Sequence, residues 1–225
     1  PMGHHFKKAM EQQDEQSPLF LEEIGDPEKR YVKGEFIDQG GMKEITAFED
    51  SFTVRDVAMA TLLDNNDPDT IDRFINEARL TASLQHPNIV PLYDMGLNEQ
   101  AEPFFTMKLI GGQALDHLLE SLQAKRETAS LQELMQIFIK ICDAVAYAHF
   151  KGVVHLDLKP ANVCIGDYGE VIVCDWGIAK VIGEADDVEG CLLDPQVYNE
   201  ATLHGVVKGS PGYLSPEQVD TALGE

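Results

Sequence analysis

A lysine, an asparagine and two carboxylates are spaced along the middle of this chain as phosphoryl transfer requires. Asp157, Lys159 and Asn162 lie in the segment HLDLKPAN, and Asp175 begins the triplet DWG. In such a set, one carboxylate orients the attacking hydroxyl and the lysine offsets charge on the moving phosphoryl group. The asparagine and the second carboxylate then hold magnesium. The residue types and their order therefore predict a site for magnesium-dependent phosphoryl transfer.

A short β-hairpin connects the two motifs. Residues 163–165 and 171–174 are rich in valine and isoleucine, which favour strands, and the turn sequence GDYG separates them. Asp175 therefore follows directly on the second strand of the hairpin. The two motifs at this spacing favour a catalytic arrangement over the alternative, which is a polar loop that happens to lie beside a hairpin.

The segments around these motifs predict an α+β organisation. Apolar residues at helical spacing, ended by Pro87, predict a helix at 70–84 that is embedded in strand-like sequence. Gly111 and Gly112 then interrupt the chain, and helical patterns follow. The other expected elements are strands within 31–63, at 89–95 and at 104–110, and helices at 115–123 and 131–150.

The motifs resemble those of protein kinases, with HLDLKPAN in place of the usual HRDLKxxN and DWG in place of DFG. The segments RFINEARLTASLQHPNIVPLYDMG and KGSPGYLSPEQ extend the resemblance to bacterial serine/threonine kinases of the eukaryotic type. The resemblance implies an α+β, two-lobed protein-kinase-like fold whose C-lobe is truncated after the SPE motif. Its parts are an N-terminal extension at 1–29, an N-lobe of antiparallel sheet plus one helix at 30–110, and a partial C-lobe at 111–225.

The resemblance also implies that the chain is a protein serine/threonine kinase that uses ATP and Mg²⁺. Asp157 is then the catalytic base, Lys159 contacts the γ-phosphate, and Asn162 and Asp175 bind the metal. Glu77 corresponds to the helix glutamate that pairs with a lysine on the third strand. The other residues expected around the nucleotide are Ile37, Gly40, Lys43, Ile45, Ala58, Met107, Lys108, Ile110 and Cys164.

Three positions depart from the kinase pattern. The third-strand lysine, which anchors the α- and β-phosphates in the family, is replaced by Ala60. The glycine-rich loop reads DQGGMK, so that Asp38 stands at its first glycine and Lys43 at its third. The arginine before the catalytic aspartate is replaced by Leu156. All three changes bear on whether the chain is active.

Lys43 offers a replacement for the missing lysine. Side chains two residues apart on a strand share a face, and Ile45 corresponds to the valine above the nucleotide, so Lys43 is expected to point into the same cleft. With-no-lysine kinases carry their lysine at this position of the loop. One alternative is a dead site, either a natural pseudokinase that serves as a nucleotide-binding or scaffold module or an engineered change at Ala60. Another is that Lys43 is an ordinary solvated lysine.

Asp38 and Leu156 have separate consequences. A carboxylate at Asp38 repels phosphates if it points into the cleft and costs little if it points outward. Leu156 cannot bind a phosphate on the activation loop, so activity is expected not to require loop phosphorylation. Ser210 corresponds to the family's hydroxyl residue that hydrogen-bonds the catalytic aspartate and lysine, here Asp157 and Lys159.

Composition restricts the partners of the chain. Its 225 residues include 17 basic and 39 acidic side chains, and the net charge of −22 argues against nucleic acid and anionic membrane surfaces. No apolar run is long enough to span a membrane. The four cysteines lack CxxC spacing and suit the reduced state of a cytoplasm. We therefore expect a cytoplasmic bacterial protein that meets a protein substrate or another protein partner.

In the kinase family, helices that follow the SPE motif cover the C-lobe. Without them, the apolar face of the helix at 131–150 is expected to be exposed, and large exposed apolar patches are rare in monomers. We therefore expect the chain to form a homo-oligomer or to be complemented by a missing C-terminal part.

Overall fold

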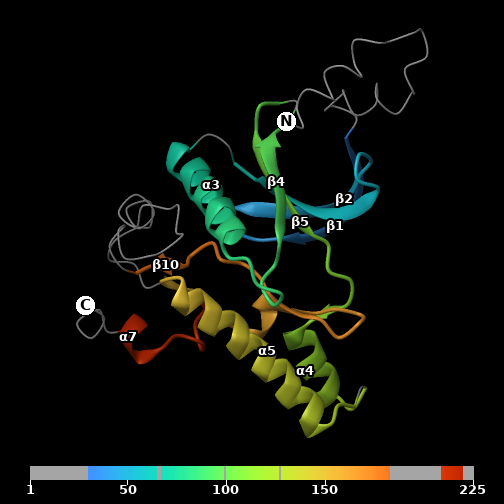
Figure 1. Ribbon diagram of the computed structural model, residues 1–225, viewed down its shortest axis with the longest axis vertical. Coiled ribbons are helices and arrows are strands. Elements are labelled where there is room, and N and C mark those ends of the chain that lie inside the picture. Colours follow the sequence, from blue (N-terminus) through green and yellow to red (C-terminus); the bar gives the residue numbers. More distant parts are fainter. Residues whose placement is uncertain (1–29, 65–66, 99, 127, 183–208, 220–225) are drawn as a thin grey trace, which may run out of the picture.

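A computed structural model describes residues 30–64, 67–98, 100–126, 128–182 and 209–219. Figure 1 shows two stacked parts. The upper part is a β-sheet with helix α3 beside it, and the lower part contains helices α4 and α5 with several short strands. The expectation for residues 1–29 lies outside the described residues, and the domain boundaries drawn from the sequence stay a prediction.

Five antiparallel strands form the sheet of the upper part, in the order β1-β2-β3-β5-β4. The middle residues of the central strand β3 are buried, as its apolar sequence VAMA requires, whereas the edge strand β1 is mostly exposed. The strands are β1 Tyr31–Gln39, β2 Lys43–Asp50, β3 Arg55–Leu62, β4 Leu92–Leu97 and β5 Pro103–Lys108.

Helix α3 (Pro68–Ser83) covers one face of this sheet. It begins at Asp67, whose side chain accepts a hydrogen bond from the backbone N–H of Asp69 and so caps the first turn. Its apolar side packs on the sheet in one buried cluster, which comprises Ala60, Leu62, Phe74, Ala78 and Phe105. This packing turns Glu77, which precedes Ala78, toward the edge of the same sheet face.

Helices α4 and α5 form most of the lower part. Helix α5 begins at a capping box, in which Ser130 and Glu133 each accept a hydrogen bond from the other's backbone N–H. The predicted hairpin is present as β8 and β9, with Val163 opposite Val173. The elements are β6 Gln113–Ala114, α4 Leu115–Gln123, α5 Leu131–Phe150, β7 Val153–Val154, β8 Val163–Ile165, β9 Val171–Val173, β10 Lys180–Val181 and α7 Pro216–Val219.

A second buried cluster joins the two parts. It comprises Leu80, Leu84, Ile89, Ala144, Ala148, Val153, Val173, Trp176, Ala179 and Val181. Trp176 is fully buried, and its ring centroid lies 4.6 Å from that of His155. Because Trp176 is the middle residue of the DWG triplet, its burial holds the neighbouring Asp175 beside the loop that follows His155.

The strand expected at 89–95 begins later than the sequence indicates, at Leu92. The preceding residues bond to the lower part instead. The N–H of Val90 donates to the carbonyl of Val173 at 3.1 Å, and the N–H of Val173 donates to the carbonyl of Asn88 at 2.8 Å. The apolar pattern of a short run does not show which segment it pairs with. The sequence therefore could not distinguish residues 89–91, which bond to the lower part, from the strand that follows them.

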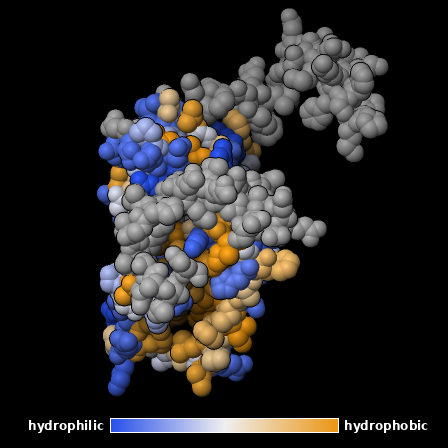
Figure 2. All heavy atoms as spheres, turned by 90° about the vertical axis from the view of Figure 1, so that its left-hand side faces the viewer, coloured by the Kyte–Doolittle hydropathy of each residue, from blue (hydrophilic) through white to orange (hydrophobic). Residues whose placement is uncertain are grey.

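The expected apolar face of α5 is exposed. Leu131, Met135 and Phe138 are 77%, 47% and 57% exposed, and Figure 2 shows hydrophobic residues gathered over the lower part of the molecule. Self-association through this face stays a prediction. None of the described helices is both long and apolar enough to cross a membrane.

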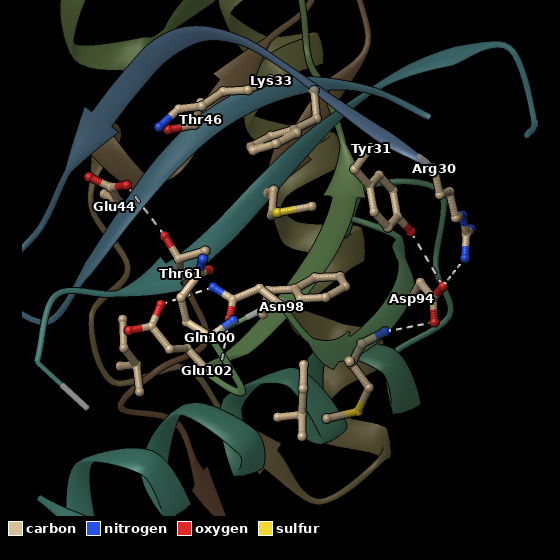
Figure 3. Close-up of a pocket in the computed structure, with 17 residues that line it drawn as sticks. Arg30, Tyr31, Lys33, Glu44, Thr46, Thr61, Asp94, Asn98, Gln100 and Glu102 are labelled. Carbon is tan, nitrogen blue, oxygen red and sulfur yellow. Dashed lines mark hydrogen bonds and ion pairs between the residues drawn. The ribbon is translucent and has the colours of Figure 1, made fainter. Parts of the chain in front are cut away.

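The sheet face opposite α3 carries a hollow of about 820 Å³ (Figure 3). Thr46, Met59, Thr61 and Phe104 line it, together with side chains of both charges. None of the residues expected around the nucleotide belongs to this lining. The hollow is therefore separate from the predicted site, which faces α3.

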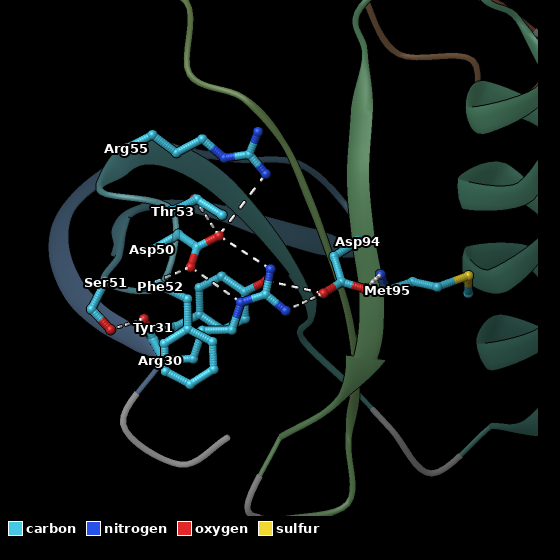
Figure 4. A network of polar contacts seen from close by, with 9 residues as sticks. All are labelled: Arg30, Tyr31, Asp50, Ser51, Phe52, Thr53, Arg55, Asp94 and Met95. Atoms are coloured by element: carbon cyan, nitrogen blue, oxygen red, sulfur yellow. Dashed lines mark hydrogen bonds and ion pairs between the residues drawn. The ribbon is translucent and has the colours of Figure 1, made fainter. Parts of the chain in front are cut away.

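A charged network closes one end of this hollow (Figure 4). The guanidinium of Arg30 donates two hydrogen bonds of 3.1 Å to the carboxylate of Asp50 and contacts Asp94. The side chain of Asp50 is only 1% exposed, and it also accepts a hydrogen bond of 2.8 Å from the hydroxyl of Thr53. The network ties the start of β1 to β2 and to β4.

We expect the Asp50→Ala variant to lose about 3 kcal/mol of unfolding free energy, because it leaves the Arg30 guanidinium without its buried partner. Burial raises the pKa of Asp50, but the hydrogen bonds from Arg30 and Thr53 outweigh it and leave the pKa below its ordinary value. The contribution of Asp50 is therefore present at neutral pH and is lost as the pH falls through the lowered pKa of the folded state.

Urea unfolding of Asp50→Ala beside Asp56→Ala measures this effect. Asp56 is an exposed aspartate on the neighbouring strand β3, so its replacement should change the stability by less than about 0.5 kcal/mol. Equal urea midpoints for the two variants would show that Asp50 and its network do not contribute to the free energy of unfolding.

Candidate active site

Asp157 is the centre of a hydrogen-bonded cluster in the loop between β7 and β8. Its Oδ2 accepts hydrogen bonds from Lys159 Nζ at 2.7 Å and from Asn162 Nδ2 at 3.2 Å. Its Oδ1 accepts one from the backbone N–H of Ser210 at 2.7 Å. Lys159 Nζ also donates to the Ser210 hydroxyl at 2.6 Å. The contacts of Ser210 with the aspartate and the lysine, expected from the sequence, are confirmed.

These contacts keep Asp157 ionised at neutral pH. Burial raises the pKa of the carboxyl, but the hydrogen bonds from Lys159 and Ser210 outweigh it and leave the pKa below its ordinary value. The residue is only 9% exposed. An ionised, largely buried carboxylate beside an ammonium group can orient a substrate hydroxyl and accept its proton.

His155 supports this loop from below. Its Nδ1 accepts a hydrogen bond from the N–H of Asp157 at 3.2 Å, and its Nε2 lies 3.0 Å from the carbonyl oxygen of Cys174. Burial lowers the pKa of His155, so the ring is neutral, with one accepting and one donating nitrogen. Leu156 follows His155 in the chain, and Asp175 follows Cys174; their φ angles are 64° and 59°. Such left-handed positions are costly for residues with side chains, so the surrounding contacts must hold them.

Lys43 belongs to a second charged cluster, at the edge of the sheet face that α3 covers. Its Nζ contacts the Glu77 carboxylate and lies 3.1 Å from Asp175 Oδ1. The Lys43 side chain is 20% exposed and that of Glu77 is 8% exposed. Lys43 therefore does not have the surroundings of a solvated strand lysine.

The sheet register explains why Lys43 can occupy the place of the missing lysine. Lys43 pairs with Leu62, and Ile45 pairs with Ala60. Lys43 and Ala60 are therefore diagonal neighbours on the same face of strands β2 and β3. Ala60 is fully buried in the cluster under α3, and its methyl group can contact no phosphate.

The two carboxylates keep Lys43 charged. Burial lowers the pKa of the ammonium, but the charges of Glu77 and Asp175 outweigh it and raise the pKa above its ordinary value. Gly177 contributes to this geometry, because a Cβ at that position would lie 2.9 Å from Glu77 Oε2. Lys43 is therefore a positive group held between a helix carboxylate and a carboxylate of the DWG triplet.

Strand β1 is irregular where it enters the glycine-rich loop. The irregularity lies between Phe36 and Asp38, and Asp38 lies opposite Ile45. Ile37 is 45% exposed in this irregular stretch. Residues directly opposite each other on antiparallel strands share a face, so Asp38 stands on the side of the sheet that Lys43 occupies. Its exposed carboxylate accepts a hydrogen bond from the N–H of Gln39 at 2.8 Å.

The remaining expected nucleotide residues do not share one face. Met107 pairs with Ala58 on the Lys43 side of the sheet, whereas Lys108 pairs with Val57 on the opposite side. Lys108 ends β5 with its ammonium 3.3 Å from Glu170 Oε1. Cys164 lies on β8 of the lower part. Gly40 closes the turn between β1 and β2 through its N–H, which donates to the carbonyl of Lys43 at 2.9 Å. Ile110 follows two residues after the end of β5.

One contact of the catalytic loop was not expected from the sequence. Gln218 Nε2 donates to the carbonyl of Leu156 at 2.8 Å, while its Oε1 accepts from the N–H of Ser215 at 3.0 Å. Gln218 thereby ties the SPE segment to the residue before Asp157. Its position directly after that motif is the only signal that could have pointed to it.

Comparison with known proteins agrees with this geometry. The protein kinase domain matches residues 31–224 of the chain. A serine/threonine-protein kinase PknD of Chlamydia muridarum is 36% identical over 208 residues, which cover 85% of this chain and 22% of that protein. The PknD of Protochlamydia amoebophila is 35% identical over 202 residues, which cover 84% of this chain and 20% of that protein. The chain thus spans about a fifth of the length of these curated relatives.

Proposed function

Because this chain belongs to the protein kinase domain family, whose α+β fold it has, we propose that it is a serine/threonine protein kinase that transfers the γ-phosphate of ATP to a protein hydroxyl. The curated relatives named above are serine/threonine-protein kinases. The observation that carries the proposal is the contact of Lys43 with both Glu77 and Asp175. This contact supports the proposal because a partly buried cation at Lys43 would take the role of the strand lysine that Ala60 replaces.

Lys43 would contact the α- and β-phosphates of ATP. The ammonium is already placed between two carboxylates, so it needs little reorganisation when a phosphate approaches, and preorganised charge is the largest contribution in this class of reaction. Glu77 would hold the ammonium in place from α3, as a buried partner on the side away from the phosphates.

Asn162 and Asp175 suit Mg²⁺, which prefers oxygen ligands and usually takes one or two from the protein. The Asn162 amide donates through Nδ2 to the carbonyl of Asp157 at 2.9 Å, which leaves its oxygen as the atom that can ligate a cation. The Asp175 side chain is 45% exposed and accessible to a metal. The bound ion would neutralise charge on the phosphates.

Asp157 would orient the substrate hydroxyl and accept its proton, and Lys159 would offset charge on the transferred phosphoryl group. Ser210 positions both side chains through its N–H and its hydroxyl. Leu156 offers no charge to a loop phosphate, and Gln218 holds its carbonyl by a neutral hydrogen bond. We therefore propose that phosphorylation of the activation segment is not required for activity.

An assay of Mg–ATP binding and of phosphate transfer by the phosphatase-treated chain tests this function. Binding with transfer to the chain itself or to a generic protein substrate supports the kinase. Nucleotide binding without transfer, or no binding with or without Mg²⁺, would favour the rival function, a pseudokinase that serves as an interaction module. The rival is favoured by Asp38, which brings negative charge to the face that should receive phosphates.

We expect the Asp38→Asn variant to bind Mg–ATP about threefold more tightly than the parent, because it removes one repulsive charge from an exposed site. Asparagine can still accept the hydrogen bond from the N–H of Gln39. The gain should shrink as the salt concentration rises, since exposed charges are screened.

Titration calorimetry at two salt concentrations measures this gain, with Glu35→Gln as the matched control. Glu35 is an exposed carboxylate on the same strand, and its replacement should leave the affinity unchanged. Weaker ATP binding by Asp38→Asn would mean that the carboxylate assists nucleotide binding.

A further inference from the structure

Two cysteine side chains meet beside the expected magnesium ligands. Cys174 Sγ lies 3.8 Å from Cys164 Sγ. Cys164 is opposite Ile172 in the β8–β9 pair, so Cys174 is its diagonal neighbour on the same face. Both residues are partly buried, whereas Cys142 is exposed on α5. No described thiol other than these two has another thiol within hydrogen-bonding distance.

The backbone of Cys174 is tied to the catalytic loop at both of its polar groups. Its N–H donates to the carbonyl of Asn162 at 2.9 Å, and its carbonyl oxygen lies 3.0 Å from His155 Nε2. Asp175 is the next residue in the chain. A movement of Cys174 is therefore transmitted to Asn162 and Asp175, the two residues expected to hold the metal.

We propose that Cys164 and Cys174 form a dithiol modification site, which a peroxide oxidises to an intramolecular disulfide that weakens Mg–ATP binding. A disulfide needs the two sulfur atoms about 1.8 Å closer than they are in the dithiol. Diagonal neighbours of a regular antiparallel pair have Cα atoms roughly 7–8 Å apart, beyond the usual range of roughly 4.4–6.8 Å for a disulfide. The bond therefore pulls the two strands together and displaces Asp175.

The reaction is balanced with hydrogen peroxide as the oxidant. One sulfur attacks an oxygen of the peroxide, the O–O bond breaks, and a sulfenic acid and a first water are formed. The second sulfur attacks the sulfenic sulfur, the S–S bond forms, and the S–O bond breaks to release the second water. The two thiols lose two electrons and two protons in total, and an added dithiol reverses the modification by exchange.

The expected loss of Mg–ATP affinity rests on the proposed function, whereas formation of the disulfide does not. The experiment uses the chain with Cys142→Ser and Cys191→Ser, which retains only the pair. After peroxide treatment and denaturing alkylation, we expect mass spectrometry to show a chain that has lost two hydrogen atoms and takes up no alkyl group. Peptide mapping should find the peptide that carries Cys164 linked to the peptide that carries Cys174.

We expect the oxidised chain to bind Mg–ATP about tenfold more weakly than the reduced chain, because small displacements of site residues have effects of this order or larger. Dithiothreitol should restore binding. In the further variants Cys164→Ser and Cys174→Ser, peroxide should leave the ATP affinity of each variant unchanged, whatever that affinity is.

Two results would overturn the proposal. One is that both thiols remain open to alkylation, or become sulfinic acids, after peroxide. The other is a quantitative disulfide with unchanged ATP affinity. If the reduced chain binds no nucleotide, the proposed function fails and the proposed effect on ATP binding fails with it. The mass measurement on the chain that retains only the pair still decides whether the pair is a modification site.

Discussion

We expect the Lys43→Ala variant to lose about a hundredfold in affinity for Mg–ATP. In this site Lys43 is the charged group between Glu77 and Asp175, and Ala60 offers no second cation. Loss of one partner from a desolvated, hydrogen-bonded charge contact costs roughly 2–5 kcal/mol, and a hundredfold change corresponds to about 2.7 kcal/mol. Nucleotide titration of the parent and the variant measures the loss.

Two further variants separate the charge of Lys43 from its packing. Lys43→Met keeps most of the side-chain stem and should lose nearly as much ATP affinity as Lys43→Ala. Lys33→Ala removes an exposed lysine from the neighbouring strand β1 and should bind ATP like the parent. Because either change at Lys43 leaves Glu77 buried without its cation, thermal melts accompany each titration to show that the variants are folded.

The sharpest test moves the lysine back to the third strand. Ala60 shares a face with Lys43 and lies under α3, close to the helix turn that carries Glu77. We expect Ala60→Lys, made in the Lys43→Ala chain, to recover part of the lost ATP affinity. Parent-like affinity in Lys43→Ala alone would show that the phosphates are held without Lys43.

The second large effect is expected at Asp157. The Asp157→Asn variant should lose about a thousandfold in the rate of phosphate transfer, in the range of general-base contributions, while its affinity for Mg–ATP changes by less than about twofold. Asparagine can accept the hydrogen bond from the N–H of Ser210, but it cannot take a proton or balance the ammonium of Lys159. Single-turnover kinetics separate the transfer step from binding.

Asp143→Asn is the matched control for this measurement. Asp143 is exposed on α5, and its replacement should preserve both binding and transfer. A transfer rate that survives in Asp157→Asn would mean either that the chemistry does not depend on this carboxylate or that a contaminating kinase supplies the signal. The Lys43 and Asp157 variants should therefore fail in different steps, the first in binding and the second in transfer.

Local order in the sequence was enough to predict most of the site. The residues Asp157, Lys159 and Asn162 are within six positions of one another, so a single loop conformation brings them together, as the structure shows. The orientation of Lys43 followed from the two-residue period of a strand, which places it on the face of Ile45. Both inferences combine short-range geometry with the resemblance to protein kinases, which supplied the roles of the loop residues and of Ile45.

Tertiary packing decided the contacts between residues that are far apart in the sequence. Lys43 meets Glu77 because α3 packs on Ala60 and Phe105, and it meets Asp175 because Trp176 is buried in the cluster that joins the two parts. The side of the sheet that Asp38 occupies depends on the irregularity in β1, which exists only in the pairing with β2.

The same holds for the thiol pair. Cys164 and Cys174 are ten residues apart in the chain, and only the register of β8 against β9 makes them neighbours. Register is set by the burial of whole strands between neighbouring elements, and here Val171 and Val173 are buried while Cys174 is only partly buried. The sequence by itself determined which groups could do the chemistry, and the packing of α3 and Trp176 decided which of them meet.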